Sequence, residues 1–268
     1  MDKITFLGAG STIFAKSVLG DCLLTPSLQG FEYALFDIDP MRLKDSADML
    51  DAINGNVNAG RARIVPYADR REALRGARFV VNAVQVGGYE PGTVIDFDIP
   101  KKYGLRQTIG DTVGIGGIFR ALRTIPVLLD FARDMIDVCP DALFLNYSNP
   151  MAMLTAVLTR HVRTVGLCHS VQVCVPHLFR DLGMDPEGVE YRIAGINHMA
   201  WLLGVEKDGT DLYPEVKRRA AARPVPHTDM VRYEIMRRFG CYVTESSEHN
   251  AEYYPWFIKG RYPELVER

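Results

Sequence analysis

The sequence lacks the features that would indicate a membrane, nucleic-acid or disulfide-bonded secreted protein. No apolar run approaches the roughly 20 residues that span a bilayer, and Met1 is not followed by the charged-then-apolar profile of a signal peptide. The 31 basic residues nearly balance the 33 acidic ones, so a net charge of −2 exerts no strong pull on nucleic acid or anionic lipid. We therefore expect neither nucleic-acid nor membrane partners.

Cysteine is scarce and irregularly placed, and the chain has neither internal repeats nor low-complexity segments. Five cysteines are an odd number with no regular spacing, which favours free thiols in a reducing cytoplasm over a disulfide framework. The remaining composition, 47% hydrophobic and 24% charged over 268 residues, is that of an ordinary globular protein. This length allows one large domain, or one domain and part of a second.

The N-terminal segment has the order strand, glycine turn, helix, strand and acid. Lys3–Leu7 is a short apolar strand, Gly8 and Gly10 follow it, and a second apolar strand from residue 33 ends in Asp37. Two glycines allow a tight turn and the close approach of a pyrophosphate to a helix N-terminus, and the acid hydrogen-bonds the ribose. Gly8, Gly10, Ser11 and Asp37 are therefore predicted to bind a dinucleotide.

Two details refine this prediction. The charge of Asp37 disfavours a 2′-phosphate, so NAD is expected rather than NADP. Ile13 stands where the dinucleotide fingerprint has its third glycine, which is a departure from the pattern.

Strands and helices continue to alternate down the chain. Strands are expected at 63–65, 79–83, 142–147 and 164–167, with helices between them at 41–54, 118–138 and 151–161. This alternation predicts an α/β fold, a Rossmann-like doubly wound parallel sheet of the lactate/malate-dehydrogenase kind, followed by part of an α+β domain. We place the NAD-binding domain at residues 1–194 and an incomplete substrate domain at residues 195–268.

Polar residues follow several of these strands, and ligands of open α/β sheets bind beyond the carboxyl ends of the strands. Asn82 and Gln85 are candidates to contact the cofactor, although a loop amide can also simply close a turn. Asn146 ends the next strand and faces a ligand, whereas Asn149 and Pro150 suit the N-cap and first position of a helix.

A glycine-rich stretch, residues 110–117, opens the long helix. Its backbone N–H groups could meet an anionic or polyhydroxylated ligand. Alternatively, Asp111 or Thr112 could simply cap the helix.

Thiol and imidazole groups follow the last strand of the predicted sheet. Cys168 and His169 come at its carboxyl end, and His198 lies in a later Gly/Asn-rich turn. Cys168 therefore belongs beside the nicotinamide end of a dinucleotide. Such a group is either a nucleophile with its base or a metal site, and a mixed sulfur–nitrogen set suits Mn²⁺ or Fe²⁺.

Five ordered motifs coincide in this chain: FLGAGS from residue 6, GDT from 110, LNYSNPM from 145, CHSVQ from 168 and AGINH from 194. Together they resemble the NAD-dependent glycosidases of glycoside hydrolase family 4, nearest to the α-galactosidase branch, which depart from the usual two-carboxylate scheme. The resemblance runs from residue 3 to about residue 258. Family members are much longer, so the chain is expected to lack much of the second domain.

The resemblance implies a redox-assisted elimination. NAD⁺ takes hydride from C3 of the sugar, and the resulting ketone acidifies the C2 proton. A divalent metal, usually Mn²⁺, polarises the C2 and C3 oxygens while a base removes that proton and the aglycone leaves. Water then adds and NADH returns the hydride.

The resemblance also assigns roles to residues. Cys168 and His198 match the metal ligands, Asn149 the substrate-binding asparagine, and Asp111 an acid that raises the basicity of the base. His169 stands where members specific for 6-phospho-α-glucosides carry an acidic proton donor, so it is a candidate for the general acid. The change from aspartate to histidine also argues against a phosphorylated substrate.

The base itself is not fixed by the sequence. Phosphoglycoside-specific members use a tyrosine of the second domain, and the comparable stretch here offers Glu248, His249 and Tyr253. Each aromatic residue of this stretch could equally belong to a core or a subunit contact.

Several alternatives remain open. The sugar could be a glucoside or galacturonide rather than an α-galactoside. A metal-independent 2-hydroxyacid dehydrogenase shares the Rossmann layout, and a non-catalytic NAD-binding sensor is a third possibility. We further expect a homo-oligomer, either dimer or tetramer.

Overall fold

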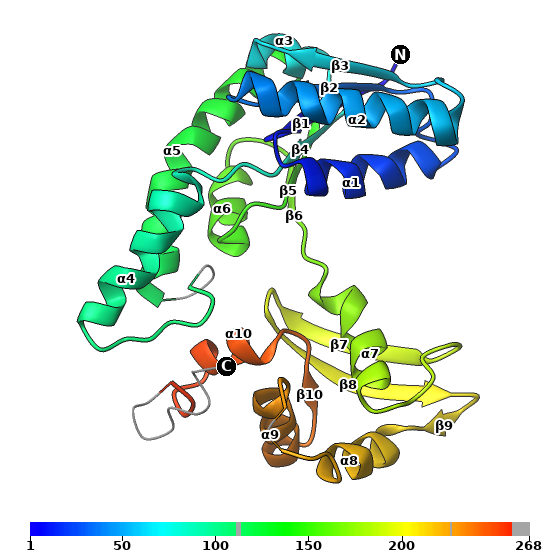
Figure 1. Cartoon of the computed structure of the whole chain (residues 1–268), viewed down its shortest axis with the longest axis vertical. Helices are drawn as coiled ribbons and strands as arrows, with labels where there is room; N and C mark the ends of the chain where they lie inside the picture. Colours follow the sequence, from blue (N-terminus) through cyan, green and yellow to red (C-terminus); the bar gives the residue numbers. More distant parts are fainter. Residues whose placement is uncertain (111–113, 226, 259–268) are drawn as a thin grey trace. The chain divides into compact units, whose positions relative to one another are not determined.

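The computed structural model describes residues 1–110, 114–225 and 227–258 (Figure 1). The chain forms two compact units. The first contains residues 1–94 and 119–167, and the second contains residues 95–118 and 168–268.

The first unit is built on a six-stranded parallel sheet of order β3-β2-β1-β4-β5-β6. Its strands are β1 (Lys3–Leu7), β2 (Glu32–Phe36), β3 (Arg63–Tyr67), β4 (Phe79–Asn82), β5 (Leu143–Asn146) and β6 (Thr164–Gly166). This is the strand order of the Rossmann fold, so the predicted fold class is confirmed.

Helices lie between these strands in the sequence. They are α1 (Thr12–Leu24), α2 (Pro40–Asn58), α3 (Arg70–Leu74), the irregular turn η1 (Gly88–Thr93), most of α5 (Gly114–Val138) and α6 (Met151–Leu158). Figure 1 shows α1 and α2 running side by side, in agreement with their contacts.

Both faces of the sheet are covered. Phe6 and Leu7 are neighbours in β1 and are both fully buried, yet they belong to different hydrophobic clusters. Successive side chains of a strand point to opposite faces, so each packs under its own helical layer. Burial of each such side chain contributes about 2 kcal/mol, which explains the near-continuous apolar runs of these strands.

The strand register brings the carboxyl ends of five strands to one edge. Leu7 lies opposite Phe36 on one side and Asn82 on the other, and Asn146 is paired with both Asn82 and Gly166. Residues that follow these ends are therefore neighbours in space, whatever their separation in sequence.

Helix boundaries differ in detail from the prediction. Helix α2 begins at Pro40, because the Asp39 carboxylate accepts hydrogen bonds from the N–H groups of Met41 and Arg42. Pro150 is the N-cap of α6 rather than its first residue, although the Asn149 side chain still accepts from Met151 N–H at 3.2 Å.

The second unit contains an antiparallel sheet of order β10-β8-β7 with β9 paired to β8. Its strands are β7 (Glu190–Ile196), β8 (Met199–Lys207), β9 (Thr210–Asp211) and β10 (Tyr242–Val243). The helices are α4 (Val94–Lys102), α7 (Ser170–Asp181), α8 (Tyr213–Ala221), α9 (Met230–Phe239) and α10 (Ser247–Tyr253).

The chain passes between the two units after Val94, after Ile118 and after Leu167. The sequence-based division at residue 194 stays a prediction about domains, but by contacts the segment from Cys168 onward belongs to the second unit. The reason is the packing of α7. Its residues Val175 and Phe179 are buried in one cluster with Leu202 of β8, so α7 belongs to the second core. Among the described helices, none has the length and apolar character to cross a membrane.

Candidate functional site

The glycine turn after β1 is fixed by contacts that leave no room for side chains. Gly8 has φ +87°, and a Cβ there would lie 2.9 Å from the backbone of Ala83. A Cβ on Gly10 would lie 2.7 Å from Asp37 Oδ2, the oxygen that accepts a hydrogen bond from Gly10 N–H at 2.7 Å. The turn thus requires both glycines, and it holds the Asp37 carboxylate at the end of β2.

The missing third glycine has a structural explanation. Ile13 is 83% exposed and takes no part in packing α1 against the sheet. The small residues Ala9 and Ala15 are fully buried instead, in the hydrophobic cluster that contains Phe6 of β1.

A pocket with a volume of about 250 Å³ opens beside this turn. Three residues predicted from the sequence line it, namely Ser11, Gln85 and Asn149. It also contains Arg120 of α5, which the sequence analysis missed, and which donates a hydrogen bond to Thr93 Oγ1. Arg120 has no distinctive sequence spacing, since only the packing of α5 brings it here.

Asn82 and Asn146 lie under the pocket rather than in its wall. Both are fully buried, and Asn82 Nδ2 donates to Asn146 Oδ1 at 2.9 Å and to Ser148 Oγ at 3.0 Å. Ser148 does line the pocket, so the two buried amides shape the pocket indirectly, by holding this serine in place. Among the described residues Asn82 Oδ1 has no hydrogen-bond partner, and an unpaired buried acceptor costs about 1–3 kcal/mol.

A thiol, an imidazole and a carboxylate meet in the second unit. Cys168, His198 and Glu245 each offer one ligand atom, and these atoms all lie within 4.8 Å of one another. His198 is buried, with φ +60° in the turn between β7 and β8. Gly195 before it permits that turn, because a Cβ there would lie 2.4 Å from Met199 O.

The donor set of this cluster fits a divalent transition metal. Thiolate, imidazole and carboxylate are the ligand types of such sites, and three protein ligands leave positions open for water or substrate. Asn197, next to His198, adds a buried Oδ1 without a hydrogen-bond partner among the described residues. The three donor atoms of the cluster are therefore close enough together to share one cation.

Two predicted candidates for the base approach His198 from α10. Tyr253 Oη lies 3.1 Å from His198 Nδ1, and the His249 ring packs against the His198 ring at 4.7 Å between centroids. The other ring nitrogen of His198, Nε2, is 3.5 Å from Glu245 Oε2. A metal-binding histidine usually hydrogen-bonds through its second nitrogen, and Tyr253 occupies that position here.

Other predicted residues lie outside the cluster. His169 is exposed at the N-cap of α7, with no side-chain capping bond. Asp111 and Thr112 fall outside the described residues. Glu245 was not singled out from the sequence, because nothing in its spacing distinguishes it from the neighbouring acids Glu248 and Glu252.

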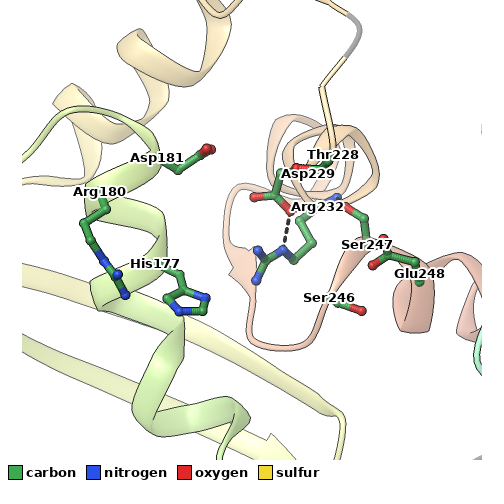
Figure 2. Close-up of a pocket in the computed structure, with 9 residues that line it drawn as sticks. All are labelled: His177, Arg180, Asp181, Thr228, Asp229, Arg232, Ser246, Ser247 and Glu248. Atoms are coloured by element: carbon green, nitrogen blue, oxygen red, sulfur yellow. Dashed lines mark hydrogen bonds and ion pairs between the residues drawn. The ribbon is translucent and has the colours of Figure 1, made fainter. Parts of the chain in front are cut away.

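A second, polar pocket of about 550 Å³ lies between α7, the start of α9 and the start of α10. Figure 2 shows the guanidinium of Arg232 and the imidazole of His177 directed into the same space, with Asp229 bonded to Arg232. Glu248 lines this pocket, and so does Ser246, whose Oγ lies 2.8 Å from His249 Nδ1. Ser246 therefore borders both the polar pocket and the histidine pair.

The Cys168 thiol differs electrostatically from the buried thiols. Burial tends to raise its pKa, but hydrogen bonds to His198 and to Ser170, whose Oγ is 3.3 Å away, lower the pKa below its ordinary value. Burial instead raises the pKa of Cys174 to about 12 and that of Cys139 to about 11. The thiolate is the form that reacts with electrophiles and binds metals. Cys168 is therefore better suited to both than Cys139 or Cys174.

This difference predicts the order of alkylation in the chain without metal. At pH 7.5, iodoacetamide should modify Cys168 at least about tenfold faster than Cys174, because a lower pKa gives more thiolate. Peptide mass spectrometry over a time course measures the two rates. Added Mn²⁺ should slow the reaction of Cys168 and leave Cys241 unaffected; equal slowing at both would contradict metal binding at the cluster.

The fold and these sites define a class of protein: an α/β protein with a nucleotide-binding fold. It also carries a cluster of thiol, imidazole and carboxylate groups of the kind that binds metal ions. The family model "Family 4 glycosyl hydrolase" matches residues 3–184, and "Family 4 glycosyl hydrolase C-terminal domain" matches residues 193–268. The chain belongs to family 4 of the glycosyl hydrolases, which confirms the resemblance found in the sequence.

Individual relatives agree with this assignment. The chain is 66% identical to an alpha-galactosidase of Bacillus subtilis, over 99% of this chain and 62% of that protein. It is 41% identical to an alpha-galactosidase of Rhizobium meliloti, over 96% of this chain and 53% of that protein. The chain thus spans only part of the length of the curated relatives it matches.

A solved structure shows the same fold. The 6-phospho-beta glucosidase of Thermotoga maritima, determined with manganese, NAD⁺ and glucose-6-phosphate, superimposes with a TM-score of 0.81. The match covers 100% of this chain and 63% of that one at 20% sequence identity.

Proposed function

We propose that this chain carries the cofactor and metal sites of an NAD- and divalent-metal-dependent α-galactosidase. The observation that supports it most directly is the cluster of Cys168, His198 and Glu245 in a chain 66% identical to an alpha-galactosidase. A metal-independent dehydrogenase would not need a cluster of metal-binding side chains.

NAD is assigned to the glycine turn and its pocket. Gly8 and Gly10 let backbone N–H groups approach the pyrophosphate, with Ser11 and Gln85 in the pocket wall. Asp37, held by Gly10, is placed to accept hydrogen bonds from the ribose hydroxyls and to repel a 2′-phosphate. Arg120 adds a positive charge to the same pocket.

The metal is assigned to Cys168 and His198, with Glu245 as a third donor. A bound NAD⁺ would supply a hydride acceptor for the sugar, and Mn²⁺ or another divalent cation would supply Lewis-acid polarisation of the sugar oxygens. The residues that hold these groups would do so as thiolate, neutral imidazole and carboxylate.

Proton transfer at C2 is assigned to α10. Tyr253 is the preferred base, because its Oη already contacts His198, and His249 is the second candidate. Glu248 is less suited, since its side chain lines the polar pocket instead. His169 is proposed as proton donor to the leaving group, Asp111 as the acid that supports the base, and Asn149 as a sugar contact. Asn146, also predicted to bind substrate, is fully buried and would act only through Ser148, to which it is hydrogen-bonded.

The α-galactoside preference follows from the relatives, and α-glucosides or α-galacturonides remain alternative substrates of the same chemistry. We also propose that the protein is cytoplasmic, because free cysteines are typical of a reducing compartment. We further propose that it forms a homo-oligomer.

The direct test is hydrolysis of p-nitrophenyl α-galactoside by the full-length natural protein with NAD⁺, Mn²⁺ and reductant. Omitting NAD⁺, or removing metal with EDTA and desalting, should reduce turnover at least about 1,000-fold, and restoring the missing component should recover it. A panel of α-galactoside, α-glucoside and α-galacturonide assigns the sugar.

Deuterium at C2 of the substrate tests the proton-transfer step. A primary isotope effect on kcat is expected if C2 deprotonation limits the rate. Full turnover without NAD⁺ or metal would exclude the redox mechanism. NAD⁺ binding without hydrolysis of any glycoside in the panel would favour the sensor.

A further inference from the structure

The carboxylate of Asp229 does not cap the helix that it precedes. Asp229 is the N-cap residue of α9 and is 6% exposed, yet its side chain accepts no hydrogen bond from the N–H groups of residues 230–232, all of which the structure describes. An aspartate at this position normally accepts from an N–H group two or three residues further on. Since a buried charge is costly unless it is paired and hydrogen-bonded, Asp229 needs other donors.

Three side chains supply those donors. Arg232 Nε donates to Asp229 Oδ1, as Figure 2 shows, and Ser247 Oγ donates to the same oxygen at 3.1 Å. Tyr242 Oη donates to Oδ2. These donors come from α9, α10 and β10, so one carboxylate joins three elements of the second unit. The side chains of Asp229 and Arg232 are only 8% and 14% exposed, and hydrogen bonds between ionised groups are among the strong ones.

Ser247 takes the capping role that Asp229 leaves open. Arg232 is the third residue of α9, and its backbone N–H donates to Ser247 Oγ at 3.4 Å. The hydroxyl hydrogen of Ser247 is directed to Asp229, so a lone pair of the same oxygen is available to this N–H group. The start of α10 is thereby attached to the start of α9.

The same contacts hold the chain on both sides of Glu245. Arg232 Nη1 donates to the carbonyl oxygen of Thr244 at 3.4 Å, and Thr244 directly precedes Glu245. Ser247, bonded to the Asp229 carboxylate, follows Glu245 by two residues. Between these two attachments the Glu245 carboxylate reaches the metal cluster, with Oε2 3.5 Å from His198 Nε2.

We propose that the Asp229–Arg232 ion pair positions Glu245 in the metal cluster. This inference rests on the proposed function, in which the cluster holds a divalent cation. Its physical basis is preorganisation. Because the pair fixes residues 244–247 in the protein without metal, less conformational freedom is lost when a cation binds, and affinity rises.

Substitution of Asp229 by asparagine removes the charge and keeps the shape. Asp229→Asn should raise the Kd for Mn²⁺ about tenfold in the full-length natural protein, because residues 244–247 lose their attachment and the outer-shell partners of metal ligands commonly have effects of this size. Ser247→Ala leaves the ion pair intact and should raise the Kd about threefold, the effect of one hydrogen bond. The electron paramagnetic resonance of unbound Mn²⁺ measures both, and Ser247→Ala decides the question if Asp229→Asn does not fold.

A merely structural role of the pair predicts a different result, namely a lower Tm with an unchanged Kd for Mn²⁺. If Asp229 acts through Glu245, Asp229→Asn should add nothing to the effect of Glu245→Gln in a double-mutant cycle, whereas independent effects multiply. Glu234→Gln is the comparison variant. Glu234 also accepts from an arginine three residues further along α9, but its partners Arg237 and Arg238 lie on the same helix, so the Kd should not change.

Hydrogen exchange gives a readout that needs neither metal nor activity. In Asp229→Asn, the amides of residues 242–246 should exchange at least about tenfold faster than in the parent, with no change in β1. An unchanged Kd in Asp229→Asn and Ser247→Ala, multiplicative effects with Glu245→Gln, or unchanged exchange would each overturn the inference alone. A parent protein that binds no Mn²⁺ would refute the proposed metal site, and this inference with it.

Discussion

Replacement of Cys168 by serine is expected to weaken Mn²⁺ binding by at least about 100-fold, because a serine hydroxyl stays protonated at neutral pH and offers no anionic sulfur. In the full-length enzyme kcat should fall about 1,000-fold, since Lewis-acid polarisation contributes several kcal/mol to catalysis. The cluster has only three donors among the described residues, so loss of one leaves His198 and Glu245 alone. Binding is measured by the electron paramagnetic resonance of unbound Mn²⁺ during titration.

Cys241→Ser is the matched control for this experiment. Cys241 is also a half-buried free thiol, but it lies outside the cluster, so Mn²⁺ affinity and kcat should not change. In the same titration Glu245→Gln should weaken Mn²⁺ binding by about 10–100-fold if its carboxylate acts as a ligand or orients His198. Unchanged affinity in Cys168→Ser would place the metal elsewhere.

The second large effect concerns the glycine turn of the first unit. Gly8→Ala should weaken NAD⁺ binding about 100-fold, because a Cβ 2.9 Å from the backbone of Ala83 forces the turn out of place. A 100-fold loss of affinity corresponds to about 2.8 kcal/mol of binding free energy. Calorimetric titration with NAD⁺ measures it, and differential scanning calorimetry follows the stability of the same samples.

Gly60→Ala separates steric collision from backbone strain. Gly60 has φ +69°, close to the +87° of Gly8, but a Cβ there meets nothing within 4 Å. Both variants incur the left-handed penalty of about 1–2 kcal/mol, and only Gly8→Ala adds the collision. Gly60→Ala should therefore lose stability and keep its NAD⁺ affinity. Equal NAD⁺ affinities in the two variants would contradict the assignment of the turn.

The local motifs of the first unit could be predicted from the sequence because their physical causes are local. A glycine needed for a tight turn, an acid at a strand end and an apolar run buried on both faces all follow from neighbouring residues. The alternation of strands and helices then fixed the parallel sheet, since parallel strands need long crossovers. Cys168 and His198 could be proposed for the same reason, as each follows a strand or lies in a turn.

The composition of the second site depends on contacts between segments that are distant in the sequence. Glu245 joins Cys168 and His198 only because β10 pairs with β8 and brings the chain after Val243 beside the β7–β8 turn. The packing of α10 distinguishes Tyr253 and His249 from Glu248, which the sequence left as equals. Asn82 looks like a pocket residue in the sequence, yet its amide is buried against Asn146.

The sequence by itself thus determined the fold class, the dinucleotide turn and the thiol and imidazole of the second site. Only the tertiary structure decided which carboxylate lies beside that thiol and imidazole. The physical reason is that backbone turns and strand ends depend on residues adjacent in the chain. The meeting of Cys168, His198 and Glu245 depends on strands and turns that come together from far apart in the sequence.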